Sequence, residues 1–184
     1  MAVYIALVKG VNVGGRNRLA MADLRAAVAA IGASAVRTYL QSGNAVFTID
    51  AGEPVALAGA LEAALAARSL GCGGVVVLSR ERLAAAIADN PFPDESDPTR
   101  LHLLFRREPV GPLEQEAIAR LVQRSAERGR LDEVVVAGDT LYLHTPTAMA
   151  SSVLGAGLTS LAALGVTTAR NYRTASALLA LARD

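Results

Sequence analysis

The chain has little of several residue types, and each shortage excludes a class of protein. Cys72 is the only cysteine among 184 residues, which excludes an intramolecular disulfide and a zinc site built from several cysteines. Aromatic residues make up 4% of the chain, whereas RNA-recognition domains stack bases on exposed aromatic side chains. We therefore expect no nucleic-acid partner.

The chain also lacks an excess of charge of one sign, and it lacks long hydrophobic runs. Eighteen basic and 17 acidic residues leave a formal net charge of +1, so an anion has to be bound locally rather than drawn in by a global field. No apolar run approaches the roughly 20 residues that cross a bilayer, and the apolar stretch 3–8 lacks the flanks of a secretion signal. We expect a soluble cytoplasmic protein with no membrane partner, no cofactor and no metal.

Apolar residues, in contrast, make up 52% of the chain, enough to fill the core of one ordinary domain or two small ones. In the first half their spacing alternates between strand-like runs and helical stripes. Predicted strands cover 3–8, 36–40, 45–49 and 75–78. Predicted helices follow the first strand, start at Pro54 and follow Ser79, which can cap the third helix.

The second half repeats this order of elements. Predicted strands cover 101–105, 134–137, 141–144 and 166–169. Predicted helices begin at Pro112, Ser151 and Thr174. Ser151 is expected to cap a helix that reaches Leu164. The pattern predicts an α+β fold, a tandem duplication of two ferredoxin-like (βαββαβ) repeats with extra helices after each repeat.

The two halves are separated by a segment with a composition of its own. Residues 90–98 contain three prolines and three acidic residues, which is typical of a connection rather than of a helix or strand. The predicted domains are an N-terminal ferredoxin-like repeat plus helix over 1–89, a linker over 90–99, and a C-terminal ferredoxin-like repeat plus terminal helix over 100–184.

Two short polar loops directly follow predicted strands, at 12–18 and 41–44. In a ferredoxin-like sheet the first and second strands run parallel on either side of an antiparallel third, so their carboxyl ends emerge at the same edge. Residues 71–74, before the fourth strand, should open there as well. Lys9, the only lysine of the chain, ends the first strand. Its uniqueness is explained at least as well by codon bias as by a need for a compact charge.

This edge is the predicted site. Backbone N–H groups at a glycine-rich helix start bind anions, and Lys9, Arg16 and Arg18 add positive charge. The alternative is that the glycines only permit a tight turn, and turn formation alone also explains Gly43 and Asn44. The candidate ligand-binding residues are Lys9, Asn12, Gly14, Gly15, Arg16, Asn17, Gln41, Ser42, Gly43 and Asn44, with Arg170 and Asn171 contributed by the second repeat.

Catalytic chemistry has less support, and we name no catalytic residue. Ser42 and Cys72 have no neighbouring base in the sequence. Antiparallel pairing could bring His102 and His144 close together on one face, but a two-histidine site needs a third ligand or a carboxylate, and none is evident nearby. We expect both histidines to be packing residues.

Four segments, 4–15, 37–47, 90–92 and 168–174, resemble the family called domain of unknown function 1697 (DUF1697). The resemblance implies two related α/β repeats and implies no activity. The carboxyl half departs from the usual pattern. Ala148 and Ala150 stand where the family has glycines, Val153 where a lysine is common, and Tyr172 where a tryptophan is common. If this segment forms part of an active site in relatives, this chain has lost or altered it.

Three hypotheses follow. The leading one is a protein that binds a small anionic or phosphorylated ligand with the loops after the first and second strands. The second is an enzyme that acts on a phosphorylated or nucleotide substrate in the same pocket, with Lys9 stabilising charge. The third is a homodimeric scaffold whose loops perform no ligand chemistry.

Overall fold

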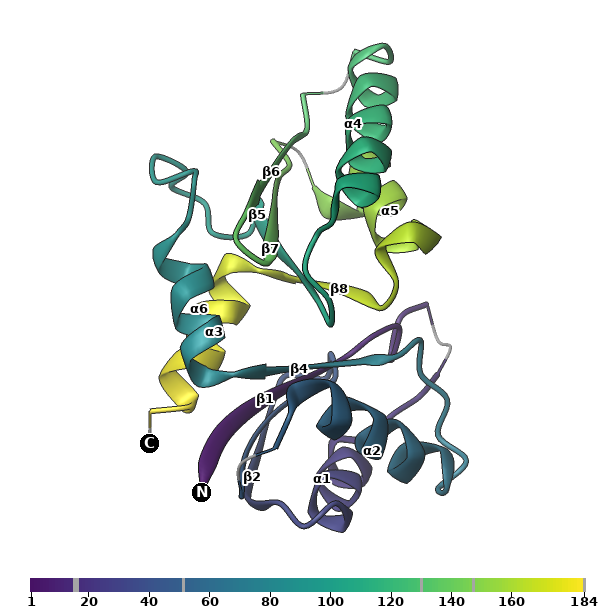
Figure 1. Ribbon diagram of the computed structural model, residues 1–184, viewed down its shortest axis with the longest axis vertical. Helices are drawn as coiled ribbons and strands as arrows, with labels where there is room; N and C mark the ends of the chain where they lie inside the picture. Colours follow the sequence, from purple (N-terminus) through teal and green to yellow (C-terminus); the bar gives the residue numbers. More distant parts are fainter. Residues whose placement is uncertain (15–16, 51, 130, 147, 184) are drawn as a thin grey trace. The chain divides into compact units, whose positions relative to one another are not determined.

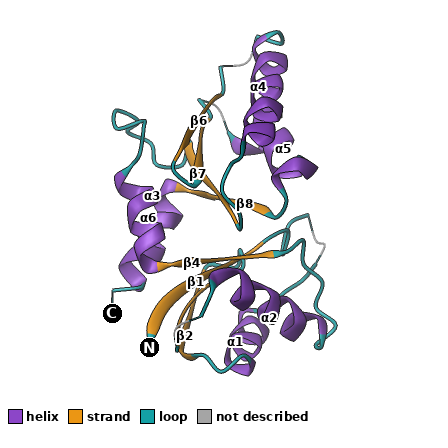
Figure 2. Ribbon diagram, viewed as in Figure 1, coloured by secondary structure: helices purple, strands orange, loops and turns teal. Residues whose placement is uncertain are grey.

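The computed structural model describes residues 1–14, 17–50, 52–129, 131–146 and 148–183. The α+β class is confirmed, with two four-stranded antiparallel sheets and six α-helices over the described residues (Figure 2). The first half contains β1 (Ala2–Val8), α1 (Met21–Ala30), β2 (Ser34–Tyr39), β3 (Asn44–Ile49), α2 (Pro54–Ala66), β4 (Val75–Ser79) and α3 (Arg80–Ala88).

The second half contains β5 (Leu101–Arg106), α4 (Pro112–Ala126), β6 (Glu133–Ala137), β7 (Thr140–His144), α5 (Val153–Ser160), β8 (Thr167–Asn171) and α6 (Tyr172–Leu181). Short 3₁₀ helices, η1 (Met149–Ser151) and η2 (Ala162–Leu164), flank α5. Among the described residues, no helix is long and apolar enough to span a bilayer.

The chain divides into two compact units. The first unit comprises residues 1–84 and 177–184, and the second unit comprises residues 85–176. The domains expected from the sequence, 1–89 and 100–184 with a linker over 90–99, remain a prediction about which segments fold together.

The sheet of the first unit has the strand order β2-β3-β1-β4. β3 pairs antiparallel with both β1 and β2, so β1 and β2 run parallel and their carboxyl ends lie at the same edge. Asn44, the first residue of β3, lies opposite Leu7 of β1 and Tyr39 of β2. The start of β4 is at this edge too, because Val75 pairs with Val8.

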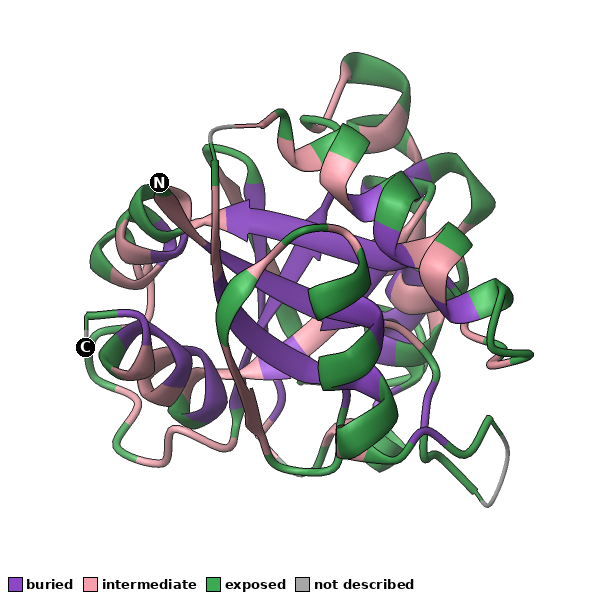
Figure 3. Ribbon diagram, turned by 90° about the horizontal axis from the view of Figure 1, so that it is seen from below, coloured by how far each residue is buried: buried purple, intermediate pink, exposed green. Residues whose placement is uncertain are grey.

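The core of the first unit follows from the alternation of side chains along β1. Tyr4, Ala6 and Val8 are buried under α1 and α2, which cover one face of the sheet (Figure 1). Ile5 and Leu7 point to the other face and are also fully buried, which explains why β1 reads as a continuous apolar run. Most strands are buried along most of their length, whereas the edge strands β2 and β6 contain no buried residue and the helices keep exposed faces (Figure 3).

The sheet of the second unit has the order β6-β7-β5-β8. The predicted hairpin is present, because Ala137 pairs with Thr140 across the two-residue turn Gly138–Asp139. Leu104, Leu141 and Leu143 form a buried cluster with residues of α4 and α5. This second core is built by the same strand-on-helix packing as the first.

Two predicted helix starts and one helix end were wrong by a few residues. Ser152, not Ser151, caps α5, since its Oγ accepts a hydrogen bond of 2.8 Å from Gly155 N. The helix ends at Ser160 rather than at Leu164, where the Ser160 hydroxyl bonds the carbonyl of Ala156 at 2.7 Å.

The start of α6 is likewise different from the prediction. Asn171 Oδ1 accepts a hydrogen bond of 2.9 Å from Thr174 N, so Asn171 takes the capping role that the sequence assigned to Thr174. Ser79 was assigned correctly, because its Oγ accepts a bond of 3.1 Å from Arg82 N at the start of α3.

Candidate functional site

Backbone hydrogen bonds tie three segments together at the carboxyl end of β1. Val8 N donates to Gly43 O at 2.8 Å, and Lys9 N donates to Gly74 O at 2.8 Å. Gly73 N donates back to Lys9 O at 2.8 Å. Three segments therefore meet at one edge of the first sheet: residues 9–14 with 17–19, residues 40–43, and residues 70–74. We call these residues the loop edge.

Asn12 fastens the first loop of the loop edge to the second. Its Nδ2 donates to Leu19 O at 2.8 Å and to Gln41 O at 2.7 Å, while its Oδ1 accepts from Leu19 N at 2.9 Å. Its backbone is in the left-handed region, with φ of 56°, which asparagine tolerates better than most residues. The amide of Asn12 is thus occupied in holding the two loops at a fixed separation.

Asn17 and Asn44 bind backbone groups in the same way. Asn17 Nδ2 donates to Gly10 O at 3.0 Å. Asn44 is fully buried and its Nδ2 donates to Tyr39 O at 3.0 Å and to Ser42 Oγ at 2.8 Å. These asparagines shape the loops, so in any ligand site their first contribution is to the position of their neighbours.

Gly43 allows the second loop to pack against the first. Its φ is +74°, and a Cβ added there would lie 2.7 Å from Val11 Cγ2 and 2.9 Å from Val8 Cβ. Because real Cβ contacts are longer than this, a side chain at residue 43 would push the two loops apart.

Lys9 is half-buried at the end of β1. A Cβ added to Gly73 would lie 3.2 Å from Lys9 Cγ, so the aliphatic stem of Lys9 runs along the backbone of the third segment. Gly14, Arg18, Gln41 and Ser42 are exposed. Gly15 and Arg16, which the sequence also placed in the site, lie outside the described residues.

Arg170 and Asn171 belong to the second unit. Arg170 Nη1 donates to Thr168 Oγ1 at 2.8 Å and to Ala169 O at 2.7 Å. Burial lowers the pKa of the Arg170 guanidinium to about 10. Asn171 caps α6, and the participation of both residues in the predicted site stays a prediction.

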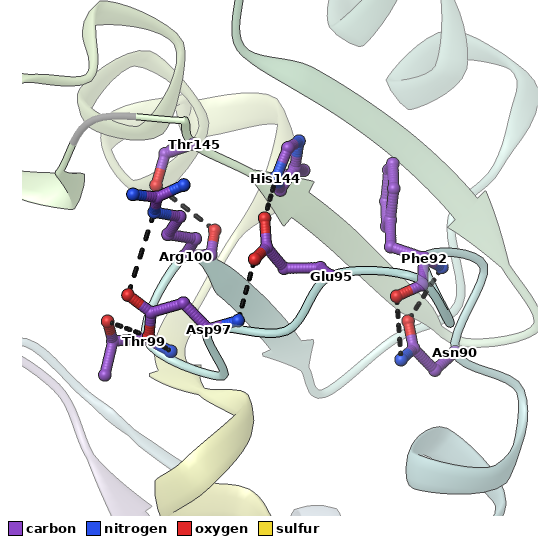
Figure 4. A network of polar contacts seen from close by, with 8 residues as sticks. All are labelled: Asn90, Phe92, Glu95, Asp97, Thr99, Arg100, His144 and Thr145. Carbon is purple, nitrogen blue, oxygen red and sulfur yellow. Dashed lines mark hydrogen bonds and ion pairs between the residues drawn. The ribbon is translucent and has the colours of Figure 1, made fainter.

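A second polar cluster surrounds His144 in the second unit (Figure 4). Glu95 Oε2 lies 2.6 Å from His144 Nε2, and the Phe92 ring stacks on the imidazole with centroids 5.3 Å apart. Glu95 Oε1 also accepts a bond of 2.8 Å from Asp97 N. The Asp97 N–H and the His144 ring both bond the Glu95 carboxylate and hold its pKa below the ordinary value.

The sequence missed this pair because Glu95 is 49 residues away from His144, in a segment whose composition indicated a linker. The two histidines do not share a face. Leu101 lies opposite His144 and His102 lies opposite Leu143, so the imidazoles point to opposite sides of the sheet. Among the described residues, no group of three or more acidic, histidine or cysteine side chains could hold a metal ion.

The Glu95–His144 pair borders a pocket of about 330 Å³ whose walls include Phe92 and Glu133. A catalytic dyad needs the second ring nitrogen to face a substrate. The Nδ1 atom of His144 is buried and makes no hydrogen bond. This arrangement fits a structural role for the pair, which fastens residues 90–99 to β7.

The fold and the loop edge define a class of protein, a two-unit α+β protein in which polar loops gather at one sheet edge. The family model described as protein of unknown function (DUF1697) matches residues 1–142, and the chain belongs to this family.

Among solved structures, the conserved bacterial protein SP0830 from Streptococcus pneumoniae is similar, with a TM-score of 0.74. It is 23% identical in sequence, and the match covers 100% of this chain and 99% of that chain. At this identity the likeness shows the fold alone. No curated protein matches the chain.

Proposed function

We propose that the protein binds a small anionic ligand, phosphorylated or carboxylated, at the loop edge of the first unit. The observation that carries the proposal is the convergence of three hydrogen-bonded segments at the loop edge, whose first segment, residues 9–14 and 17–19, contains Lys9 and Arg18 and no carboxylate. In a chain whose net charge is +1, this is a local concentration of positive charge, and a preorganised one attracts and orients anions.

Backbone strain supports the proposal. Among the described residues, five non-glycine residues have positive φ, and three of them, Asn12, Asn17 and Leu40, lie in the loop edge. Such conformations cost of order 1 kcal/mol or more each and gather at binding and catalytic sites, where a rigid scaffold holds them. A turn that only reversed the chain would be built more easily from glycine.

The residues of the site divide into two roles in this proposal. Asn12, Asn17 and Asn44 hold the loops through bonds to the backbone. Lys9 and Arg18 supply positive charge, and Gln41 and Ser42, both exposed, offer an amide and a hydroxyl for orientation.

The test is calorimetric titration with inorganic phosphate and pyrophosphate. Lys9→Met keeps the stem that lies along Gly73 and removes the charge, and Arg18→Gln removes the second cation. A charged hydrogen bond contributes about 1.5 to 3 kcal/mol, so each variant should weaken binding by roughly tenfold or more. Arg128→Gln, an exposed arginine of the second unit, is the matched control and should bind like wild type. Equal affinity in all variants would contradict the proposal.

We also propose that the two units are repeats of one ferredoxin-like fold. The strand orders β2-β3-β1-β4 and β6-β7-β5-β8 correspond position by position, and in each unit a helix connects the first strand to the second. This correspondence supports a tandem duplication.

A further inference from the structure

We propose that the ligand of the loop edge is amphipathic, a small molecule in which the anionic group carries an apolar body that contacts Val13 and Leu40. This inference rests on the proposed anion site and adds the chemical class of the ligand. Val13 is 69% exposed and Leu40 is 57% exposed, so both present aliphatic surface to whatever occupies the edge.

The two aliphatic side chains flank one hydrogen bond. Asn12 Nδ2 donates to Gln41 O at 2.7 Å, Val13 directly follows Asn12, and Leu40 directly precedes Gln41. The fastened loops therefore bring Val13 and Leu40 to the same end of the sheet as Lys9. A single exposed aliphatic residue is ordinary, but this pair stands beside a cationic stretch on a preorganised backbone.

The conformation of Leu40 is the stronger observation. Its φ is 55°, in the left-handed region, where a branched, bulky side chain is a true outlier and glycine or asparagine is favoured. The chain therefore keeps at residue 40 a side chain that strains the backbone and is exposed to water. An apolar contact made only when ligand binds accounts for both costs.

Positive charge and exposed aliphatic surface together select the ligand class. Lys9 and Arg18 suit a phosphate or carboxylate, and Val13 and Leu40 suit a short alkyl or comparably apolar body. Inorganic anions would occupy only the charged half of such a site. A small amphiphile such as an alkyl phosphate would occupy both halves.

The experiment measures the Kd of inorganic phosphate and of ethyl, butyl and hexyl phosphate, each below its micelle concentration, by calorimetry. Wild type should bind roughly two- to fourfold tighter for each methylene that becomes buried. Leu40→Asn, which suits the left-handed backbone, should keep phosphate binding and lose most of this chain-length dependence. Its melting temperature should stay the same or rise.

Ala35→Asn is the matched control. Ala35 is exposed and has φ of 49°. It lies at the start of β2, the end of the strand that is away from the loop edge. This variant relieves the same kind of strain and should keep the chain-length dependence of wild type.

Three results would overturn the inference. If phosphate binds and no variant, wild type included, shows chain-length dependence, the anion site stands and the apolar half is wrong. If no anion binds at all, the proposed function fails together with this inference. If vesicles of anionic lipid bind while hexyl phosphate does not, the partner is a membrane surface rather than a small amphiphile.

Discussion

Single residues set the spacing of the loop edge. Asn12 pulls the first two loops together through its side-chain amide, and Gly43 permits the close approach by having no side chain. Neither effect involves a charged group. The geometry of the edge is thus fixed by packing and by neutral hydrogen bonds, which are little affected by salt.

Variants of two glycines separate the energetic cost of close packing at the loop edge from the cost of backbone strain. Gly43→Ala should destabilise the fold by roughly 2 to 4 kcal/mol, the sum of left-handed strain and overpacking against Val8 and Val11. Gly14, with φ of +57° and open space around a Cβ, is the matched control. Gly14→Ala should cost only the strain, about 1 kcal/mol. Urea unfolding of both variants measures the difference, and equal losses would show that the close approach at residue 43 is unimportant.

At this scale the sequence predicted which loops lie together but not what their individual side chains bond. Strand-ending loops with glycine and asparagine are visible in the sequence, and the prediction that they meet at one edge was correct. The sequence could not show that Asn12 bonds Leu19 and Gln41, since nothing in the spacing of residues 12 and 41 indicates a contact between them. Asn171 was a ligand candidate, and its capping of α6 depends on a helix start that propensity placed three residues later.

At the scale of elements, segment 90–99 is the informative case. Its prolines and charges indicate a connection, and it forms neither helix nor strand. It is nevertheless fastened to its unit, because Glu95 bonds His144 of β7 and Arg173 N of α6 donates to Pro98 O at 3.4 Å. Composition describes the local backbone preference, whereas these long-range bonds are a property of the folded unit.

The Glu95 bonds make stability depend on pH in a definite direction. The pKa of Glu95 is lowered in the folded protein, first by the Asp97 N–H and then by His144. Folding therefore favours the ionised carboxylate, and this stabilisation is complete above the ordinary glutamate value of 4.5 and is lost as pH falls below it through the folded pKa.

As the pH falls below about 4.5, wild type should accordingly lose stability, and Glu95→Gln should lose less stability over the same pH change. Asp94→Asn, an exposed carboxylate beside the same pocket, controls for net charge and should follow the wild-type curve. Urea midpoints measured from pH 7 to pH 3 test this. A Glu95→Gln curve parallel to wild type would show that the bonds to Glu95 add no pH-dependent stability.

The capping serines show why element boundaries are harder to predict than elements. Ser151 and Ser152 are equally good caps by residue type. The choice of Ser152 is made by tertiary contacts, since its hydroxyl also donates to Asp132 Oδ2 at 2.9 Å. Residue 132 is far from the helix in sequence, so helix signals alone could not distinguish the two.

For the whole molecule, the apolar pattern was sufficient to predict both sheets. Strands buried on both faces give continuous apolar runs such as 3–8, and the helical stripes between them fixed the order of elements. The division of the chain was not visible in the same way. Residues 177–184 belong to the first unit, although they follow the whole of the second unit in sequence.

This discontinuity makes the last part of α6, residues 177–181, a structural part of the first unit. Leu178 of α6 is 1% exposed, so Leu178→Ala should destabilise the fold by roughly 2 to 5 kcal/mol through lost burial and the cavity left behind. Leu181, on the same helix and only half-buried, is the matched control, and Leu181→Ala should cost clearly less. Amide hydrogen exchange locates the effect, because protection along β1 should fall more in Leu178→Ala than protection along β5. The reverse order would place the end of α6 in the second unit, and the chain would then consist of two units continuous in sequence.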